Sequence, residues 1–282
     1  MKRIYPVMLS LLLLYFSFYY TSKVVDIIRS KDPIMMKIKK EKNKYEENGK
    51  NAIVKDNRVT PGKNKKVVNE KESFMKMKKY GTYNDSLYVF DEEKPNKKVD
   101  DYFDKYIESG RTDSNEVALL FQIKRFEDIN KIIETIKMNN IKATFFIDGL
   151  YIENNRSETN YLKEQGHELE LLSYNDTLER ETFIEGLHAL FNITNISPKY
   201  CYSEYDNKSV LELCNSLSMH TIIPTIMANN NSFSIIKNKL KSGSIISLGN
   251  SDKNLNTIIN YIKQRGYKLV TLEELLSESL EK

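Results

Sequence analysis

Lys142-Ala143-Thr144-Phe145-Phe146-Ile147-Asp148-Gly149 is the stretch of this chain that decides its fold. Upstream, the apolar run Val117-Ala118-Leu119-Leu120-Phe121 continues into Gln122-Ile123-Lys124. Downstream lies Gly166-His167-Glu168-Leu169-Glu170-Leu171-Leu172-Ser173-Tyr174-Asn175-Asp176. Short apolar runs of this kind, bounded by turn residues, are typical of buried strands.

Strand and helix patterns alternate from Asn115 to the end of the chain. The expected strands are Val117–Phe121, Ala143–Ile147, Glu168–Leu172, Lys199–Tyr202, Thr221–Ile223, Ser244–Leu248 and Lys268–Val270. The expected helices are Phe126–Met138, Thr159–Gln165, Leu178–Asn192, Asn207–Leu217, Ser232–Leu240, Leu255–Arg265 and Leu272–Leu280. This alternation predicts an α/β domain with a mostly parallel sheet. Periodicity does not choose between a barrel and a doubly wound open sheet.

In order and spacing, these stretches resemble the polysaccharide deacetylase family, the NodB homology domain of carbohydrate esterases. The similarity runs from Glu116 to Leu276 and includes Gly243–Leu248 and Arg265–Leu272. It implies a distorted (β/α) barrel of about seven parallel strands over residues 115–282.

The resemblance also identifies the positions where the family keeps its catalytic groups. Family members remove acetyl groups from sugars with a divalent metal held by one Asp and two His, a second Asp as base and a further His as acid. The matching positions here are Gln122 for the base, Ile123, Leu172 and Asp176 for the metal ligands, and Asn250 for the acid. An amide does not take up a proton, and aliphatic side chains offer no lone pair. We therefore expect no catalytic residue, no bound metal and no cofactor.

A barrel retains a concave mouth at the carboxyl ends of its strands. The side chains expected to line a ligand cleft there are Gln122, Ser173, Asp176, Tyr202, Glu204 and Asn250. His167 is expected to be structural. Glu168 and Glu170 share one face of their strand.

The N-terminus carries a membrane signal. Residues 4–22 form an uncharged run of 19 residues after Lys2-Arg3, which is long enough to cross a bilayer as a helix. The run ends in Phe18-Tyr19-Tyr20, a poor cleavage site, so we expect an uncleaved transmembrane anchor over residues 1–24. The resemblance places the C-terminal domain outside the cytoplasm of a single-pass cell-membrane protein.

The segment after the anchor is basic. Residues 31–79 contain 16 Lys or Arg residues against 7 Asp or Glu residues, and few are apolar. This composition predicts a disordered linker over residues 25–80 that faces anionic lipid or wall polymer, or is simply solvated. No fold signature for nucleic-acid binding accompanies it. An approach segment, residues 81–114, is expected to hold a strand at Ser86–Phe90 and a turn or two of amphipathic helix within Val99–Ile107.

Two cysteines, Cys201 and Cys214, are too few for a disulfide framework. We expect two buried free thiols, with one bridge as the alternative in an oxidising compartment.

Three functions follow from these observations. The favoured one is a membrane-anchored, catalytically inactive domain of the bacterial envelope that binds cell-wall glycan or an envelope protein. The first alternative is a divergent active carbohydrate deacetylase with a site rebuilt around Asp176 and Glu204. The second is a purely structural protein that contacts partners through its basic segment.

Overall fold

The computed structural model describes residues 4–228, 232–249 and 254–280. Their contacts divide the chain into two compact units. The first consists of the residues up to Gly49 together with Asn64–Glu93, and the second of Lys50–Lys63 and the residues from Lys94 onward. The chain therefore leaves the first unit, contributes 14 residues to the second, and returns before entering the second for good.

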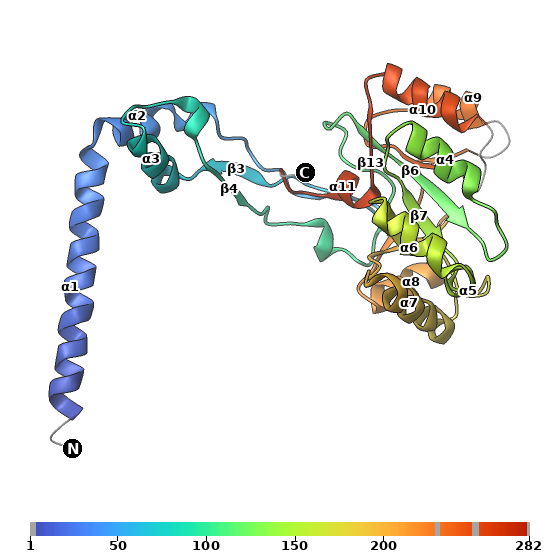
Figure 1. Cartoon of the computed structure of the whole chain (residues 1–282), viewed down its shortest axis with the longest axis horizontal. Helices are drawn as coiled ribbons and strands as arrows, with labels where there is room; N and C mark the ends of the chain where they lie inside the picture. The colour runs from blue at the N-terminus through green and yellow to red at the C-terminus, as the bar shows by residue number, and fades with distance from the viewer. Residues whose placement is uncertain (1–3, 229–231, 250–253, 281–282) are drawn as a thin grey trace. The chain divides into compact units, whose positions relative to one another are not determined.

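The first unit begins with one long apolar helix (Figure 1). Helix α1 spans Ile4–Lys31, and its stretch Leu11–Lys31 is long and apolar enough to cross a membrane. Helix α2 (Pro33–Glu41) follows after Asp32, whose carboxylate accepts the N–H of Ile34 and caps the new helix. The other elements of this unit are the short helical turns η1 (Lys42–Lys44) and η2 (Asp85–Leu87), the antiparallel strands β3 (Lys65–Val68) and β4 (Phe90–Glu93), and helix α3 (Glu70–Lys79).

The prediction of a disordered linker over residues 25–80 is wrong. The few apolar residues of this segment are spaced so that they meet in a small core, formed by Ile38, Val68, Met77 and Tyr88. Ion pairs between α2 and α3 add to it, since Lys78 contacts Asp32 at 2.6 Å. Composition predicted disorder because it counts apolar residues and not their spacing.

The second unit contains two sheets. The first has the order β1 (Ile53–Lys55), β2 (Arg58–Thr60), β5 (Tyr106–Ile107), β10 (His220–Ile222) and β9 (Tyr200–Tyr202). The second has the order β11 (Ile226–Met227), β12 (Ile245–Ser247), β6 (Glu116–Ile123), β7 (Thr144–Ile147) and β8 (Glu168–Leu171), with β13 (Lys268–Val270) pairing with the start of β6. All pairs are parallel except β1 with β2.

Helices complete the α/β architecture of this unit (Figure 1). They are α4 (Asn130–Met138), α5 (Gly149–Asn154), α6 (Arg156–Glu164), α7 (Arg180–Thr194), α8 (Lys208–Ser216), α9 (Ser232–Lys239), α10 (Leu255–Gln264) and α11 (Leu272–Leu276), with the helical turn η3 at Val99–Asp101. All seven expected strands from Val117 onward are present, within one or two residues at their ends. The α/β prediction is confirmed.

Strand pairing does not close seven strands into a barrel, contrary to that expectation. Among the described residues, no strand pairing joins β10 to β11, and none joins β8 to β9. There the carboxylate of buried Glu170 accepts the backbone N–H groups of Lys199 and Tyr200, at 2.8 and 3.0 Å. The Glu170 side chain therefore provides the hydrogen-bond acceptors that backbone carbonyls of a neighbouring strand would otherwise provide.

The predictions for the approach segment hold only in part. The expected strand Ser86–Phe90 is shifted to Phe90–Glu93, and the expected helical turns in Val99–Ile107 are limited to η3, with the strand β5 at the end of that range. Both segments owe their conformation to pairing partners distant in the sequence. Lys65–Val68 pairs with the strand, and Thr221 and Ile222 pair with β5.

The alternating faces of β6 separate two parts of the core. Val117, Leu119, Phe121 and Ile123 pack in one cluster with residues of the surrounding helices. Ala118 and Leu120 point to the other side, into a cluster shared with Tyr202 and Ile222 of the first sheet. Because side chains alternate along a strand, Gln122 belongs to this inner side, at the carboxyl end of the strand.

Candidate functional site

A pocket of about 300 Å³ lies where β6, β8 and β9 end. It is lined by Gln122, Lys124, Leu172, Ser173, Asp176, Leu178, Tyr202, Ser203, Glu204, Tyr205, Asn207 and Val210. Five of the six side chains expected in a ligand cleft meet here: Gln122, Ser173, Asp176, Tyr202 and Glu204. The sixth, Asn250, lies outside the described residues.

The floor of the pocket is a hydrogen-bonded network around Gln122. Its side-chain amide donates to the Tyr202 hydroxyl at 2.7 Å and to the Ser247 hydroxyl at 3.1 Å. These two hydroxyls lie 3.1 Å from each other. Burial raises the pKa of Tyr202 to about 12, so its hydroxyl keeps its proton at neutral pH. The position of the family's general base thus holds a neutral amide whose donors are engaged within the protein.

The neighbouring position, Ile123, offers no chemistry to the pocket. Its side chain is fully buried in the cluster that packs β6 against the helices. Leu172 is half-buried and packs against the inner cluster that contains Tyr202. Neither side chain carries an atom that could bind a cation.

Of the three residues at the positions of the family's metal ligands, only Asp176 has side-chain oxygens that could bind a metal ion. It has a left-handed backbone with φ of 58° and lies 3.7 Å from the guanidinium of Arg125. Among the described residues, no group of three or more His, Cys, Asp or Glu side chains is placed to hold a metal ion. A divalent ion needs several oxygen, nitrogen or sulfur ligands. The side chains at the family's metal positions therefore do not fit the metal that the family uses.

The loop that carries Ser173 and Asp176 is held by a buried carboxylate, Asp148. Its oxygens accept the Ser173 hydroxyl at 2.6 Å and the N–H groups of Asn175 and Asp176 at 3.3 and 3.0 Å. They also accept the N–H of Leu150 at the start of α5. These hydrogen bonds to one carboxylate hold the loop after β8 against the start of α5.

Sequence reasoning missed several of these residues. Ser247 lies one residue before the end of the expected strand Ser244–Leu248, and Asp148 directly follows the expected strand Ala143–Ile147, which was the available signal for a position near the pocket. Tyr205, with 67% of its surface exposed, lies on the pocket rim in a loop without a recognisable motif.

The remaining sequence candidates lie elsewhere. His167 is buried beside Phe145, and burial lowers its pKa to about 4. Glu168 and Glu170 line a separate hollow with Lys199 and Glu273, at the opposite ends of the strands. Cys201 and Cys214 form a disulfide between β9 and α8, so the expectation of two free thiols is wrong. Sequence spacing did not show that these elements pack side by side, with the two Cα atoms 6.3 Å apart.

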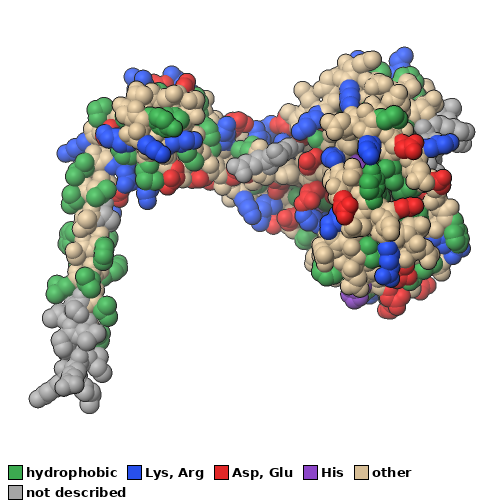
Figure 2. All heavy atoms as spheres, in the orientation of Figure 1, with side chains coloured by type: hydrophobic (Ala, Val, Ile, Leu, Met, Phe, Trp, Pro, Cys, Tyr) green, Lys and Arg blue, Asp and Glu red, His purple; other side chains and the backbone are tan. Residues whose placement is uncertain are grey.

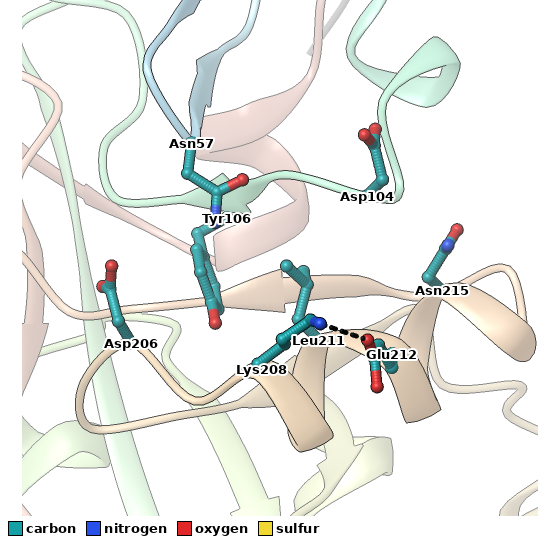
Figure 3. Close-up of a pocket in the computed structure, with 8 residues that line it drawn as sticks. All are labelled: Asn57, Asp104, Tyr106, Asp206, Lys208, Leu211, Glu212 and Asn215. Atoms are coloured by element: carbon teal, nitrogen blue, oxygen red, sulfur yellow. Dashed lines mark ion pairs between the residues drawn. The ribbon is translucent and has the colours of Figure 1, made fainter.

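Another pocket of about 440 Å³ lies between β5 and α8 (Figure 3). Its charged side chains already have partners: Asp206 contacts Arg58, Glu212 contacts Lys208, and Asp104 contacts Lys105. Tyr106 and Leu211 supply its apolar surface. Since its charges are matched internally, we assign it no ligand.

Comparison with known proteins agrees with this geometry. Residues 109–220 match the model of the polysaccharide deacetylase family. The chain is 26% identical to the uncharacterized protein YlxY of Bacillus subtilis over 277 residues, 90% of this chain and 87% of that protein.

Among solved structures, the fold matches wild-type BA3943, a CE4 family pseudoenzyme from Bacillus anthracis. The identity is 23%, the TM-score is 0.66, and the match covers 88% of this chain and 96% of that one. A BA3943 mutant with restored enzymatic activity matches at 23% identity and a TM-score of 0.67, over 88% of this chain and 99% of that one. The likeness in fold extends beyond the residues that the family model matches.

Proposed function

We propose that this chain is a catalytically inactive, membrane-anchored protein with a polysaccharide deacetylase-like domain that binds glycan of the bacterial cell envelope; the match of residues 109–220 to the family model supports the domain. The observation that carries the proposal is the set of side chains at the reaction centre. An engaged amide, two aliphatic side chains and an ion-paired Asp stand at the positions of the base and the metal ligands. The pocket itself remains open.

The pocket chemistry suits a polyhydroxylated ligand. Glu204 offers an exposed carboxylate, and Asn207 an amide whose oxygen caps α8. The hydroxyls of Ser173 and Ser203 also line the pocket, where they donate to Asp148 and to the carbonyl of Tyr205. Tyr205 presents an exposed aromatic face on which the C–H groups of a sugar ring can pack. Sites of this type combine an apolar surface with a few polar groups that fix orientation.

Two features support an anchored protein outside the cytoplasm. The stretch Leu11–Lys31 is long and apolar enough to span a bilayer. The disulfide between Cys201 and Cys214 is the kind of bond that persists in oxidising compartments.

Glycan binding is tested with the full chain in detergent micelles, titrated with peptidoglycan tetrasaccharides and chitotetraose in a calorimeter. We expect binding without release of acetate, and Tyr205→Ala should weaken it about tenfold, or roughly 1.4 kcal/mol. Tyr80→Ala is the matched control, because Tyr80 is also exposed, at 66%, but lies in the other unit. Absence of binding to both glycans would refute the proposal.

Loss of catalysis is tested by restoring the family's residues. The published mutant of BA3943 with restored activity motivates the fourfold change Gln122→Asp, Ile123→Asp, Leu172→His and Asp176→His. The new Asp at position 123 enters an apolar cluster, so the variant should be destabilised without metal. Zinc should then raise the unfolding midpoint of the fourfold variant. It should not change the unfolding midpoint of the unchanged protein.

The competing hypothesis of a rebuilt active site makes the opposite prediction. The unchanged protein would bind zinc stoichiometrically or release acetate from chitooligosaccharides, and Asp176→Ala with Glu204→Ala would abolish this. Mass spectrometry of metal content and an acetate assay decide between the two.

A further inference from the structure

The basic charge of the first unit is concentrated on two helices. The segments Lys31–Lys44 and Glu70–Lys79 together hold ten Lys residues against four acidic ones, a net charge of +6. Both helices pack on the core of Ile38, Val68, Met77 and Tyr88. The lysines are therefore displayed from a folded scaffold. Figure 2 shows Lys and Arg side chains around hydrophobic ones over this part of the unit.

Some of these lysines are used within the protein. Lys42 contacts Glu70 and Lys78 contacts Asp32, which ties α2 to α3. Lys37 lies over the ring of Tyr83 at 4.2 Å. Six exposed lysines have no such ion pair or ring contact among the described residues: Lys31, Lys39, Lys40, Lys71, Lys76 and Lys79. Their charges are available to something outside the unit.

Exposed apolar side chains stand among these lysines. On α2, Met36 is 59% exposed and precedes Lys40 by one helical turn. On α3, Met75 is 43% exposed and lies one turn from both Lys71 and Lys79. Residues four apart are neighbours on a helix surface, so each methionine has an ammonium group beside it. Tyr80 adds a ring that is 66% exposed at the end of α3.

Helix α2 follows the candidate membrane span directly in the sequence, so it lies next to the end of that span. The apolar stretch of α1 ends at Lys31, and α2 begins at Pro33. A helix of nine residues is only about 14 Å long, so α2 stays close to the end of the span. Amphipathic helices with lysines beside exposed apolar residues bind the surface of anionic bilayers.

We propose that α2 and α3 form a docking surface for anionic phospholipid headgroups, in which Lys39, Lys40, Lys71, Lys76 and Lys79 contact phosphate and Met36, Met75 and Tyr80 enter the interface. The surface would hold the first unit against the membrane that α1 anchors. It rests on the anchoring part of the proposed function and is independent of glycan binding.

The test uses the full chain reconstituted in vesicles of phosphatidylcholine, with or without about one third phosphatidylglycerol. Since the two native cysteines are disulfide-bonded, a dye can be attached at Met36→Cys or Met75→Cys, and its quenching by spin-labelled headgroups measured. We expect at least about threefold more quenching with phosphatidylglycerol, lost at about 1 M salt, where screening acts over roughly 3 Å. Met138→Cys, 77% exposed on α4 of the other unit, should show no such change.

Two charge variants of equal size complete the design. Lys39, Lys40, Lys76 and Lys79 all changed to Gln should remove the lipid dependence, whereas Lys237, Lys239, Lys241 and Lys268 changed to Gln should preserve it. Resistance to alkaline extraction reports insertion of α1 separately, so loss of anchoring is distinguished from loss of docking. Equal quenching in neutral and anionic vesicles would overturn the proposal.

Discussion

The carboxylate of Asp148 shows how a single buried residue shapes the pocket. It is fully buried and accepts hydrogen bonds from Ser173 and from three backbone N–H groups. Several donors that converge on one acceptor lose their partner together when that acceptor is removed. Buried donors without a partner carry a large desolvation cost.

Asp148→Ala should therefore lower the free energy of unfolding by about 3 kcal/mol, measured by urea titration. Asp148→Asn keeps one acceptor oxygen and should lose about half as much. A loss under about 0.5 kcal/mol for the alanine variant would contradict the role given to this carboxylate.

Glu168 and Glu170 make stability depend on pH. Burial raises the pKa of Glu168 to about 7, and burial together with the nearby charge of Glu168 raises the pKa of Glu170. The folded protein therefore holds protons that the unfolded chain releases above about pH 4.5. Stability should fall as the pH rises from about 4.5 through about 7, by roughly 1–3 kcal/mol.

Thermal unfolding between pH 5 and pH 8 measures this dependence. The midpoint should decrease toward pH 8, and Glu168→Gln should flatten the decrease because it removes the titrating group. Glu164→Gln is a control at an exposed glutamate of α6. A midpoint that rises with pH in the unchanged protein and in Glu164→Gln alike would refute the assignment.

At the scale of elements, the disulfide joins a strand to the helix that follows it. Cys201 lies on β9 and Cys214 on α8, 13 residues apart. Cross-linking a loop of this length restricts the unfolded chain and is worth about 3 kcal/mol.

Cys201→Ala with Cys214→Ala should lose about that amount of unfolding free energy. Dithiothreitol should cause a similar loss in the unchanged protein and none in the double variant. If the reductant affected both proteins equally, the bridge would not be the source of the effect.

Seven of the parallel strands from β6 onward could be predicted from sequence because they lie in short, largely apolar runs bounded by turn residues, whereas β11, with two residues, could not. Strands β1, β2 and β5 could not, since they are two or three residues long and β1 is exposed throughout. The conformation of β2 and β5 depends on partners far away in the chain, and β1 pairs with β2, the next strand in sequence.

The residues of the candidate site also divide into those that could be predicted from the sequence and those that could not. Gln122, Ser173, Asp176, Tyr202 and Glu204 were found through spacing along recognisable stretches, and they meet in one pocket. Ser247, Asp148 and Tyr205 join them through tertiary packing, which no local pattern records.

At the scale of the whole molecule, the second unit does not begin where the deacetylase-like pattern begins. Strands β1 and β2, from residues 50–63, extend the sheet of β5, β10 and β9. Val59, Val99 and Ile107 are buried in the inner core cluster. Near the C-terminus, the carboxylate of Glu278 accepts the N–H groups of Gly62 and Val99.

A chain cut to residues 115–282, the boundary that sequence predicts for the domain, should therefore fail to fold. Burying each of those three aliphatic side chains is worth roughly 1.5–3 kcal/mol, and a whole domain is stable by only about 5–15 kcal/mol. A chain of residues 32–282 retains all of them and should unfold cooperatively in calorimetry, whereas the shorter chain should bind a hydrophobic dye and show no cooperative transition. A cooperative transition of residues 115–282 within a few degrees of that of the longer chain would mean that β1, β2 and β5 are dispensable additions to a self-sufficient domain.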